Sequence, residues 1–289
     1  MWDDCEEAVL EAWTKGGHGS LGLSGLRDQI QSCGAELHAW GSSKTKPETE
    51  EIKRLQKKLE LLNASEMTEE SRNEFLLLSK QLDDLLLKQE VFWRQRSRVS
   101  WLKYGDRNTK FFHSKASQRR RRNFIEGIKN ADGDWVDEVA EVAEVASNYF
   151  MNFFKAGTCD RIEECLDAVH WRMSADMLEV LSRPYSSEEV RTALFQMGPT
   201  KAPGPDGMNA LFYQKFWHIV GPEVTEAVLD FLHTGHMVPD INYTHIVLIP
   251  KVKKPEKMAD FRPISLCNVI YKIISKVLAN RLKLILPQL

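Results

Sequence analysis

The chain is organised around two motifs, Lys201-Ala202-Pro203-Gly204-Pro205-Asp206-Gly207 and, further along, Phe261-Arg262-Pro263-Ile264-Ser265-Leu266. The first motif has two prolines and two glycines in seven residues, a composition that excludes a helix and a central strand. We therefore expect a rigid, exposed turn here, with Pro205 at a corner of the turn and a positive φ at Gly207.

The second motif is predicted to be the return strand of a β-hairpin. Ile246-Val247-Leu248-Ile249 is a short run rich in β-branched residues, Pro250 ends it, and extended structure resumes at Phe261. If the strands pair, Lys251 and Arg262 face each other at the mouth of a lysine-rich loop, an arrangement suited to a phosphate chain. The alternative is a solvated loop whose lysines protect an edge strand, and charge alone favours this alternative.

Together the two motifs resemble the fingers region of the reverse transcriptases of LINE-type (non-LTR) retrotransposons, especially those of plants. The similarity extends to upstream segments that these polyproteins carry in the same order, namely Ser97–His113, Gly133–Val136 and Asn148–Phe150. It covers nearly the whole chain, and the pair of motifs is more specific than either motif alone.

The resemblance implies functional roles for several residues. Lys251 and Arg262 match the fingers lysine and arginine that hold the triphosphate of the incoming nucleotide. The segment beside the template and primer is matched by Lys201, Pro203, Gly204, Pro205, Asp206 and Gly207. The implied partners are an RNA template and a DNA primer, and the complete enzyme is expected to use Mg²⁺.

The catalytic carboxylates of this family come from the palm and lie downstream of the segment that corresponds to Leu266. They are an Asp after an aromatic-rich strand and a Tyr-x-Asp-Asp turn that hold two Mg²⁺ ions. Tyr104-Gly105-Asp106-Arg107 lacks the second Asp, so we expect a truncated product without a palm, a catalytic residue or a metal of its own. Although the family is an RNA-directed DNA polymerase, this chain is predicted to be inactive alone.

A basic segment between Arg94 and Lys129 supports an alternative function, that of a non-catalytic RNA- or DNA-binding module. Aromatic residues are interleaved with its cations, as in proteins that bind single-stranded nucleic acid. We expect the apolar rings, such as Phe111 and Phe112, to be core anchors. The candidate contacts are Arg119, Arg120, Arg121, Arg122, Arg107 and Lys110. For the arginine run, RNA contact is favoured over mere solvation, and nuclear import is an alternative. A degenerate reading frame is a third hypothesis for the whole chain.

The chain is predicted to be α+β and predominantly helical, with a helical hairpin or coiled-coil region before a fingers subdomain that contains a β-hairpin. Heptad spacing predicts two helices folded back on each other, with the seam residues Ile52, Leu55, Leu59, Leu62, Phe75, Leu78, Leu82, Leu85, Gln89 and Phe92. A dimeric coiled coil is the alternative. The predicted domains are a helical segment (1–46), the hairpin (47–101), a basic linker with a short β-hairpin and a helix (102–180), and the fingers (181–289).

Local signals predict the helices of the fingers segment. The run Ser186-Ser187-Glu188-Glu189 is expected to cap a helix, after a stretch from Cys159 to Pro184 that the pattern does not assign. An aromatic-rich helix is expected over 210–220, followed by a helix with Pro222 in its first turn that ends at Gly235. Asn268 is expected to cap a last helix with the apolar face Ile270, Ile273, Ile274, Val277, Leu278, Leu282 and Ile285.

Composition limits the class of protein. Hydrophobic residues make up 43% of the 289 residues, with eight Trp and thirteen Phe, so the chain is not disordered. The formal charge of −2 gives no global indication of nucleic-acid binding. Five scattered cysteines and no basic-then-apolar leader favour a protein of the nucleus or cytoplasm that is not secreted. No apolar run is long enough to span a membrane. Neither oligomeric state nor substrate sequence follows from these patterns.

The fingers segment is predicted to be poorly soluble on its own. Residues 181–289 would expose an unpaired strand edge and apolar surface if nothing packs on the β-hairpin. Expression of this fragment should therefore give aggregated protein in size-exclusion chromatography. A monomer that unfolds cooperatively would contradict this prediction.

Overall fold

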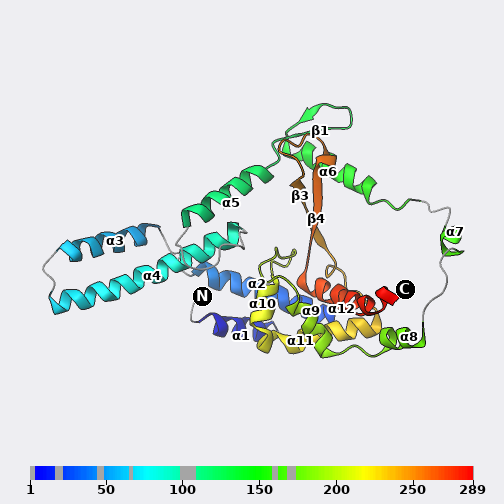
Figure 1. Cartoon of the computed structure of the whole chain (residues 1–289), viewed down its shortest axis with the longest axis horizontal. Coiled ribbons are helices and arrows are strands. Elements are labelled where there is room, and N and C mark those ends of the chain that lie inside the picture. Colours follow the sequence, from blue (N-terminus) through cyan, green and yellow to red (C-terminus); the bar gives the residue numbers. More distant parts are fainter. Residues whose placement is uncertain are drawn as a thin grey trace. The chain divides into compact units, whose positions relative to one another are not determined.

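The computed structural model describes residues 4–16, 22–43, 49–64, 68–97, 109–157, 162–167 and 174–288 (Figure 1). The described residues are mostly helical, with two small antiparallel hairpins, which confirms the α+β, predominantly helical class. None of the helices in these ranges is both long and apolar enough to cross a membrane. The chain divides into two compact units, one around His38–Phe124 and the other formed by Asp4–Leu37 with Ile125–Leu289.

The unit around His38–Phe124 is built on a helical hairpin. α3 (Thr49–Ala64) and α4 (Glu69–Ser97) pack side by side, and an ion pair of 2.7 Å joins Lys58 of α3 to Glu74 of α4. The seam between them buries Ile52, Leu55 and Leu78. α5 (Thr109–Asn123) packs on α4. A helical hairpin is thus present where the heptad spacing predicts one.

The predicted seam is wrong at the C-terminal end of α4. The side chain of Phe92 is 44% exposed, although the heptad spacing places it in the seam. Its neighbour Trp93 is instead directed at α5, because the Trp93 ring lies 4.2 Å from that of His113. A straight helix drifts against a strict seven-residue repeat, so the seam identified near Leu78 does not extend unchanged to Phe92.

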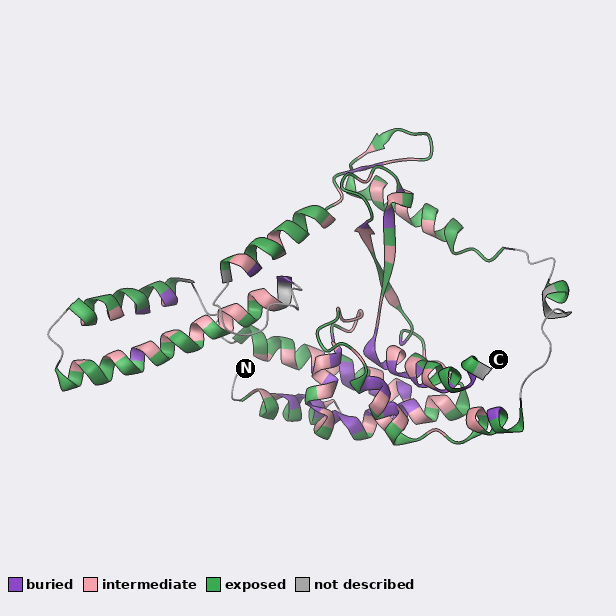
Figure 2. Ribbon diagram, viewed as in Figure 1, coloured by how far each residue is buried: buried purple, intermediate pink, exposed green. Residues whose placement is uncertain are grey.

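The second unit has a helical core. Its central helices are α9 (Ser187–Phe195), α11 (Trp217–Thr234) and α12 (Val269–Ile285). Against them pack α1 (Cys5–Lys15), α8 (Ala175–Ser182) and α10 (Ala210–Lys215). Buried residues concentrate in these helices (Figure 2). The fully buried side chains of this core include Trp13, Tyr213, Leu194, Ile270, Ile273, Val190, Val220 and Val224.

The N-terminal helices belong to this same core. α1 (Cys5–Lys15) contributes Trp13, and the first part of α2 (Leu23–Ser43) contributes Leu26, Ile30 and Cys33. The sequence analysis instead treats residues 1–46 as a separate segment. Periodicity shows that a short helix has an apolar face but not which distant element covers it. Residues 181–289 produced alone would lose this cover, which adds a second reason for poor solubility.

The helix expected to run from Ala210 to Val220 is interrupted earlier than predicted. α10 ends at Lys215, and α11 begins at Trp217, so that Pro222 lies inside α11 rather than in its first turn. Gly221 is needed here because a Cβ at this position would lie 2.8 Å from the Trp217 ring. Gly235 ends α11 as expected, in a left-handed conformation with φ of 69°.

An antiparallel ribbon extends from the helical core. β3 (Thr244–Pro250) pairs with β4 (Phe261–Cys267) along their whole lengths. At the loop end, Phe261 and Met258 form a small second core with Ile128. Ile128 belongs to a short hairpin of β1 (Ile128–Lys129) and β2 (Trp135–Val136), and α6 (Val139–Phe153) covers the same core.

The stretch between α6 and α9, which the sequence pattern does not assign, contains two short helices. They are α7 (Ile162–Asp167) and α8. The Ser174 hydroxyl accepts a hydrogen bond from the Met177 N–H at the start of α8. The start of α9 is the capping box expected from the sequence, because the Ser186 and Glu189 side chains each accept a hydrogen bond from the other's backbone N–H.

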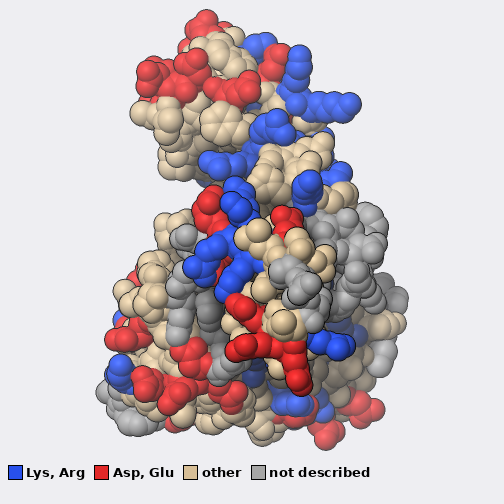
Figure 3. All heavy atoms as spheres, turned by 90° about the vertical axis from the view of Figure 1, so that its left-hand side faces the viewer, with Lys and Arg blue, Asp and Glu red and all other residues tan. Residues whose placement is uncertain are grey.

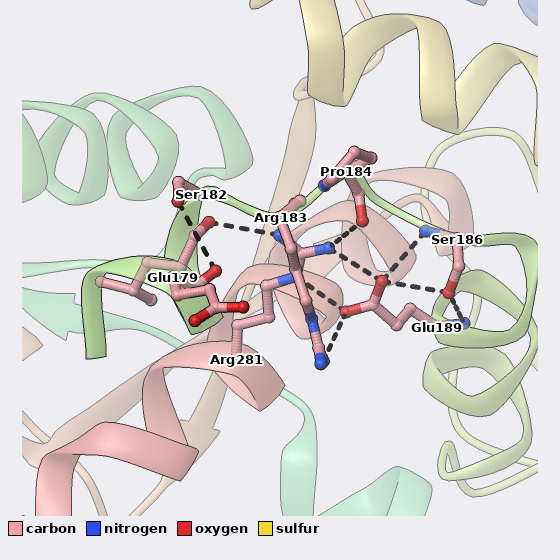
Figure 4. Close-up of polar contacts among 8 residues, drawn as sticks. Glu179, Ser182, Arg183, Pro184, Ser186, Glu189 and Arg281 are labelled. Atoms are coloured by element: carbon pink, nitrogen blue, oxygen red, sulfur yellow. Dashed lines mark hydrogen bonds and ion pairs between the residues drawn. The ribbon is translucent and has the colours of Figure 1, made fainter. Parts of the chain in front are cut away.

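A buried ion pair joins α12 to the start of α9 (Figure 4). The guanidinium of Arg281, which is 2% exposed, donates two hydrogen bonds of 2.7 and 2.9 Å to the Glu189 carboxylate. It also donates to the carbonyl oxygens of Leu181, Arg183 and Pro184. The hydrogen bonds from Arg281 lower the pKa of Glu189 to about 2. This one side chain therefore closes the loop between α8 and α9.

The buried face of α12 is consequently different from the predicted one. Leu278 and Leu282, which the sequence pattern places on the apolar face, are each 45% exposed. Arg281 occupies the buried position instead, with its guanidinium 3.7 Å from the centre of the Tyr185 ring. A residue type that is almost always exposed can be buried when all its donors are satisfied.

Replacement of Arg281 is expected to destabilise the second unit. In Arg281→Leu, the Glu189 carboxylate would lose its cation and three carbonyl oxygens their donor, which should lower the free energy of unfolding by about 3 kcal/mol or more. Urea denaturation followed by circular dichroism measures the change. The matched control is Lys283→Leu on the exposed side of α12, for which we expect a change within about 0.5 kcal/mol. Equal effects of the two substitutions would contradict this account.

Candidate nucleic-acid interface

The ribbon brings Lys251 and Arg262 to the same end but not directly opposite each other. Arg262 pairs with Ile249, whereas the Lys251 N–H donates to the Asp260 carbonyl at 2.7 Å. The two cations are therefore offset by two residues, not face to face as the sequence analysis expects. Lys251 follows the last residue of β3 directly, and Arg262 is the second residue of β4, so both cations lie at the loop end of the ribbon.

The loop between the strands is ordered by its own hydrogen bonds. The Asp260 carboxylate accepts from the backbone N–H groups of Glu256 and Lys257, and these bonds lower its pKa. The Lys251 ammonium donates to the Ala259 carbonyl at 2.7 Å. Lys129 of β1 forms an ion pair with Glu256, which fixes the loop to the neighbouring hairpin. Lys251 and Arg262 are both exposed, so a ligand can reach them.

The turn Lys201–Gly207 is held against the other end of the ribbon by Asn268. The Asn268 side-chain oxygen accepts from the Asp206 N–H at 3.3 Å, and its amide nitrogen donates to the carbonyls of Asp240 and Ile241. A Cβ at Gly204 would lie 2.3 Å from the Asn268 side-chain oxygen. Gly204 is thus required because the backbone of the turn lies close to the Asn268 side chain. Gly207 has the expected positive φ, 74°.

Asn268 was predicted only as a helix cap, and its larger role was missed. Its carbonyl does accept from the Lys272 N–H at the start of α12, but its side chain makes no capping hydrogen bond. It lies 62 residues from Asp206 and 27 from Ile241 in the chain. No local pattern reveals partners at such separations.

The Asp206 carboxyl lies in an environment that resists its ionisation. Burial raises the pKa of Asp206 to about 6, although a hydrogen bond from the Met208 N–H and the nearby Lys272 charge act in the opposite direction. Asp206 was predicted to belong to a turn rather than to a catalytic pair. The structure places it in that turn, with its side chain bonded to the backbone two residues on.

The turn and the two cations are separated by the length of the ribbon. Asn268 follows the last residue of β4, and Arg262 is the second residue of that strand. Arg262 and Cys267 are five steps apart along β4, a span of roughly 17 Å at about 3.4 Å per residue. Lys251 and Arg262, which are predicted to hold the triphosphate, thus lie at one end of the ribbon. The turn predicted to lie beside the template and primer is held at the other end by Asn268, so the two groups of residues do not share one pocket.

The basic residues predicted to contact nucleic acid lie on α5, in the other unit. Arg119, Arg120, Arg121, Arg122 and Lys110 are all exposed, while Arg107 lies outside the described residues. Consecutive helical positions are about 100° apart, so the four arginines surround the end of α5 rather than forming one face. The anchor role expected for Phe112 is observed, because its side chain is 1% exposed.

Basic residues do not form a continuous field on the face drawn in Figure 3. On the face drawn in Figure 3, Lys and Arg side chains gather in clusters that Asp and Glu side chains separate. This agrees with the formal charge of −2. Any phosphate contact would therefore depend on local clusters such as the end of α5.

No protein-family model matches the chain. The chain is similar to the transposon TX1 uncharacterized 149 kDa protein of Xenopus laevis, with 27% identity over 198 residues. The matched region is 67% of this chain but 15% of that relative, so the chain spans a small part of its length. The similarity relates the chain to a transposon-encoded protein, in agreement with the broader part of the resemblance found in the sequence.

The raised pKa of Asp206 predicts that the difference in folding stability between the natural chain and Asp206→Asn depends on pH. The asparagine oxygen can still accept from the Met208 N–H, but it cannot ionise. In the natural chain the folded carboxyl holds its proton up to a pKa of about 6, against 3.8 when unfolded, so the stability of the fold decreases as pH rises through this window. Asp206→Asn should avoid this loss, which is no more than about 3 kcal/mol.

Urea denaturation at pH 4 and pH 7.5 tests this prediction. Asp206→Asn should gain stability relative to the natural chain only at the higher pH. A constant difference across pH would mean that the Asp206 carboxyl titrates normally.

Proposed function

We propose that the chain forms the linker and fingers part of a LINE-type retrotransposon reverse transcriptase, of the type found in plants. Lys251 and Arg262 then hold the triphosphate of an incoming nucleotide, and the turn Lys201–Gly207 lies beside the template and primer. The partners are an RNA template and a DNA primer, in the nucleus or cytoplasm. The similarity to a transposon-encoded protein supports the general relation.

The observation that carries this proposal is the β3–β4 ribbon. One end of it displays two exposed cations that are offset by two residues, and its other end is fixed to the Pro/Gly-rich turn through Asn268. A lysine point charge beside an arginine fork suits a chain of phosphates. The rigid spacing between the two ends suits a polymer that must lie in register with a nucleotide.

The proposed enzyme activity requires groups that this sequence does not supply. The sequence contains no Tyr-x-Asp-Asp turn, and no group of three or more His, Cys, Asp or Glu that could hold a metal ion occurs among the described residues. These residues therefore do not fit a two-Mg²⁺ centre, and no catalytic step through Mg²⁺ is derived for them. We infer that the chain does not extend a primer alone.

A second candidate function, non-catalytic binding of RNA or DNA, is favoured by the basic end of α5. Arg119–Arg122 are exposed there, and the helix is fixed on α4 through Phe112 and the contact of His113 with Trp93. The arginines thus belong to an ordered element that can present them to phosphates. Because the four arginines surround the helix end, they can contact a flexible single strand more readily than the straight backbone of a duplex.

RNA binding of the whole chain tests the role of α5. We expect single-stranded RNA to bind with an affinity that falls as salt rises, and the change Arg119–Arg122→Ala to weaken binding at least tenfold and to reduce the salt slope. Fluorescence anisotropy at two salt concentrations measures both. The matched control removes four exposed cations from α3, in Lys53, Arg54, Lys57 and Lys58, and should have a much smaller effect.

Primer extension on an RNA template with Mg²⁺ is run beside this titration. We expect no extension by the pure chain. Extension would show that carboxylates of this chain are catalytic and would overturn the inference of inactivity. Binding that is unchanged by the arginine substitutions would remove the second candidate function, whereas binding lost with them would support it.

A further inference from the structure

The loop between β3 and β4 is supported from outside the ribbon. It runs from Lys251 to Asp260, and the two exposed cations of the candidate interface lie at its two ends. An isolated pair of antiparallel strands is only marginally stable in water and needs a further strand or a helix to pack against. β1 and α6 lie against this end of the ribbon (Figure 1), so they are in a position to provide that support.

A continuous path of hydrogen bonds leads from β1 to Lys251. The Lys129 N–H donates to the Glu256 carbonyl at 2.7 Å, and the Lys129 ammonium donates to the Glu256 carboxylate. The Glu256 N–H in turn donates to the Asp260 carboxylate at 3.1 Å. The Asp260 carbonyl then accepts the Lys251 N–H at 2.7 Å. Because each residue on this path is bonded to the next, the backbone at Lys251 is held in place from β1.

A second path, made of apolar contacts, leads from β1 to Arg262. Ile128, which is 0% exposed, packs with Met258 and Phe261 in the small second core, and α6 covers the same core. Phe261 directly precedes Arg262 in β4. The core that holds the Phe261 ring therefore also fixes the backbone from which the Arg262 side chain extends.

The two paths end on the same two cations that are proposed to hold a triphosphate. Two charges at a fixed separation bind a chain of phosphates more tightly than two charges that move independently, because little conformational entropy is lost on binding. The Lys251 ammonium has three donors and gives one to the Ala259 carbonyl, so donors remain for a phosphate. Support at both ends of the loop would thus raise the affinity for a triphosphate without contact between β1 and the ligand.

We propose that Ile128 and Lys129 of β1 are positioning residues for Lys251 and Arg262. The inference rests on the proposed function, in which these two cations hold the triphosphate of a nucleotide. Neither residue of β1 touches the nucleotide, and each acts by fixing the loop. The β1–β2 hairpin, which the sequence pattern assigns to a linker, is then a structural part of the nucleotide site.

Amide hydrogen exchange of the whole chain tests the support without a ligand. Lys129→Glu places two carboxylates in contact, so peptides within 251–260 should exchange several-fold faster because the loop opens more often. The double substitution K129E/E256K restores opposite charges and should return the exchange to that of the natural chain. Lys155→Glu, the same change at an exposed lysine that follows α6, is the matched control and should leave the loop unchanged.

Nucleotide binding tests the positioning of the cations. Fluorescence anisotropy of N-methylanthraniloyl-dATP and N-methylanthraniloyl-dAMP compares a triphosphate, which can reach both cations, with a monophosphate, which can reach one. Ile128→Ala leaves every charge in place, so it should weaken triphosphate binding about tenfold and change monophosphate binding by less than about twofold. Ile273→Ala, the same truncation at an equally buried position of the helical core, should destabilise the unit but keep the preference for the triphosphate.

The two measurements separate a failure of this proposal from a failure of the proposed function. A triphosphate preference that survives both Ile128→Ala and Lys129→Glu would overturn the positioning role and leave the role of the two cations intact. Equal binding of both probes by the natural chain would instead show that the cations do not hold a triphosphate, while faster loop exchange in Lys129→Glu would still show that β1 orders the loop. Loop exchange that is unchanged in both variants would overturn the proposal whatever the chain binds.

Discussion

The buried amide of Asn268 joins the elements on which the candidate site depends. Its oxygen holds the backbone at Asp206, and its nitrogen holds the carbonyls of Asp240 and Ile241, while the residue itself begins α12. The Pro/Gly-rich turn, the entry to β3 and the exit from β4 are thus fixed by one side chain. Because a buried amide left without its partners costs free energy, these segments cannot move independently. The position of the ribbon relative to the turn is consequently a property of the fold rather than of a bound ligand.

Basic side chains have different environments in the helical core and at the candidate interface. In the core, Glu189 and three carbonyls accept hydrogen bonds from the Arg281 guanidinium. Arg281 therefore stabilises the fold, and none of its donors remains for a ligand. At the loop end of the ribbon and at the end of α5, the cations are exposed. An arginine of this chain is therefore available to a ligand only where its guanidinium is exposed. Sequence counts of basic residues do not distinguish these two situations.

Much of the fold could be predicted from sequence because its signals are local. Heptad spacing predicts the α3–α4 hairpin, and the Ser186–Glu189 box marks the start of α9. Gly235 marks the end of α11, and Gly207 marks a positive φ. The errors concern residues whose environment is set from far along the chain. Phe92 and Leu282 were placed in buried faces, and Arg281 was overlooked, because periodicity does not say which face a distant helix covers. Family resemblance predicts roles for Lys251, Arg262 and the turn Lys201–Gly207, but the register of the two cations and the role of Asn268 required the structure.

The division of the chain also has a consequence for its synthesis. α1 and the first part of α2 complete a core with α9 to α12, yet the whole of the α3–α5 unit is translated between them. At about 5–20 residues per second, Trp13 and Leu26 remain without their partners on the ribosome for roughly ten seconds or more. During this time the α3–α5 unit can fold by itself, since its contacts are close in sequence. The N-terminal helices are therefore the part of this chain that most needs protection by a chaperone before synthesis ends.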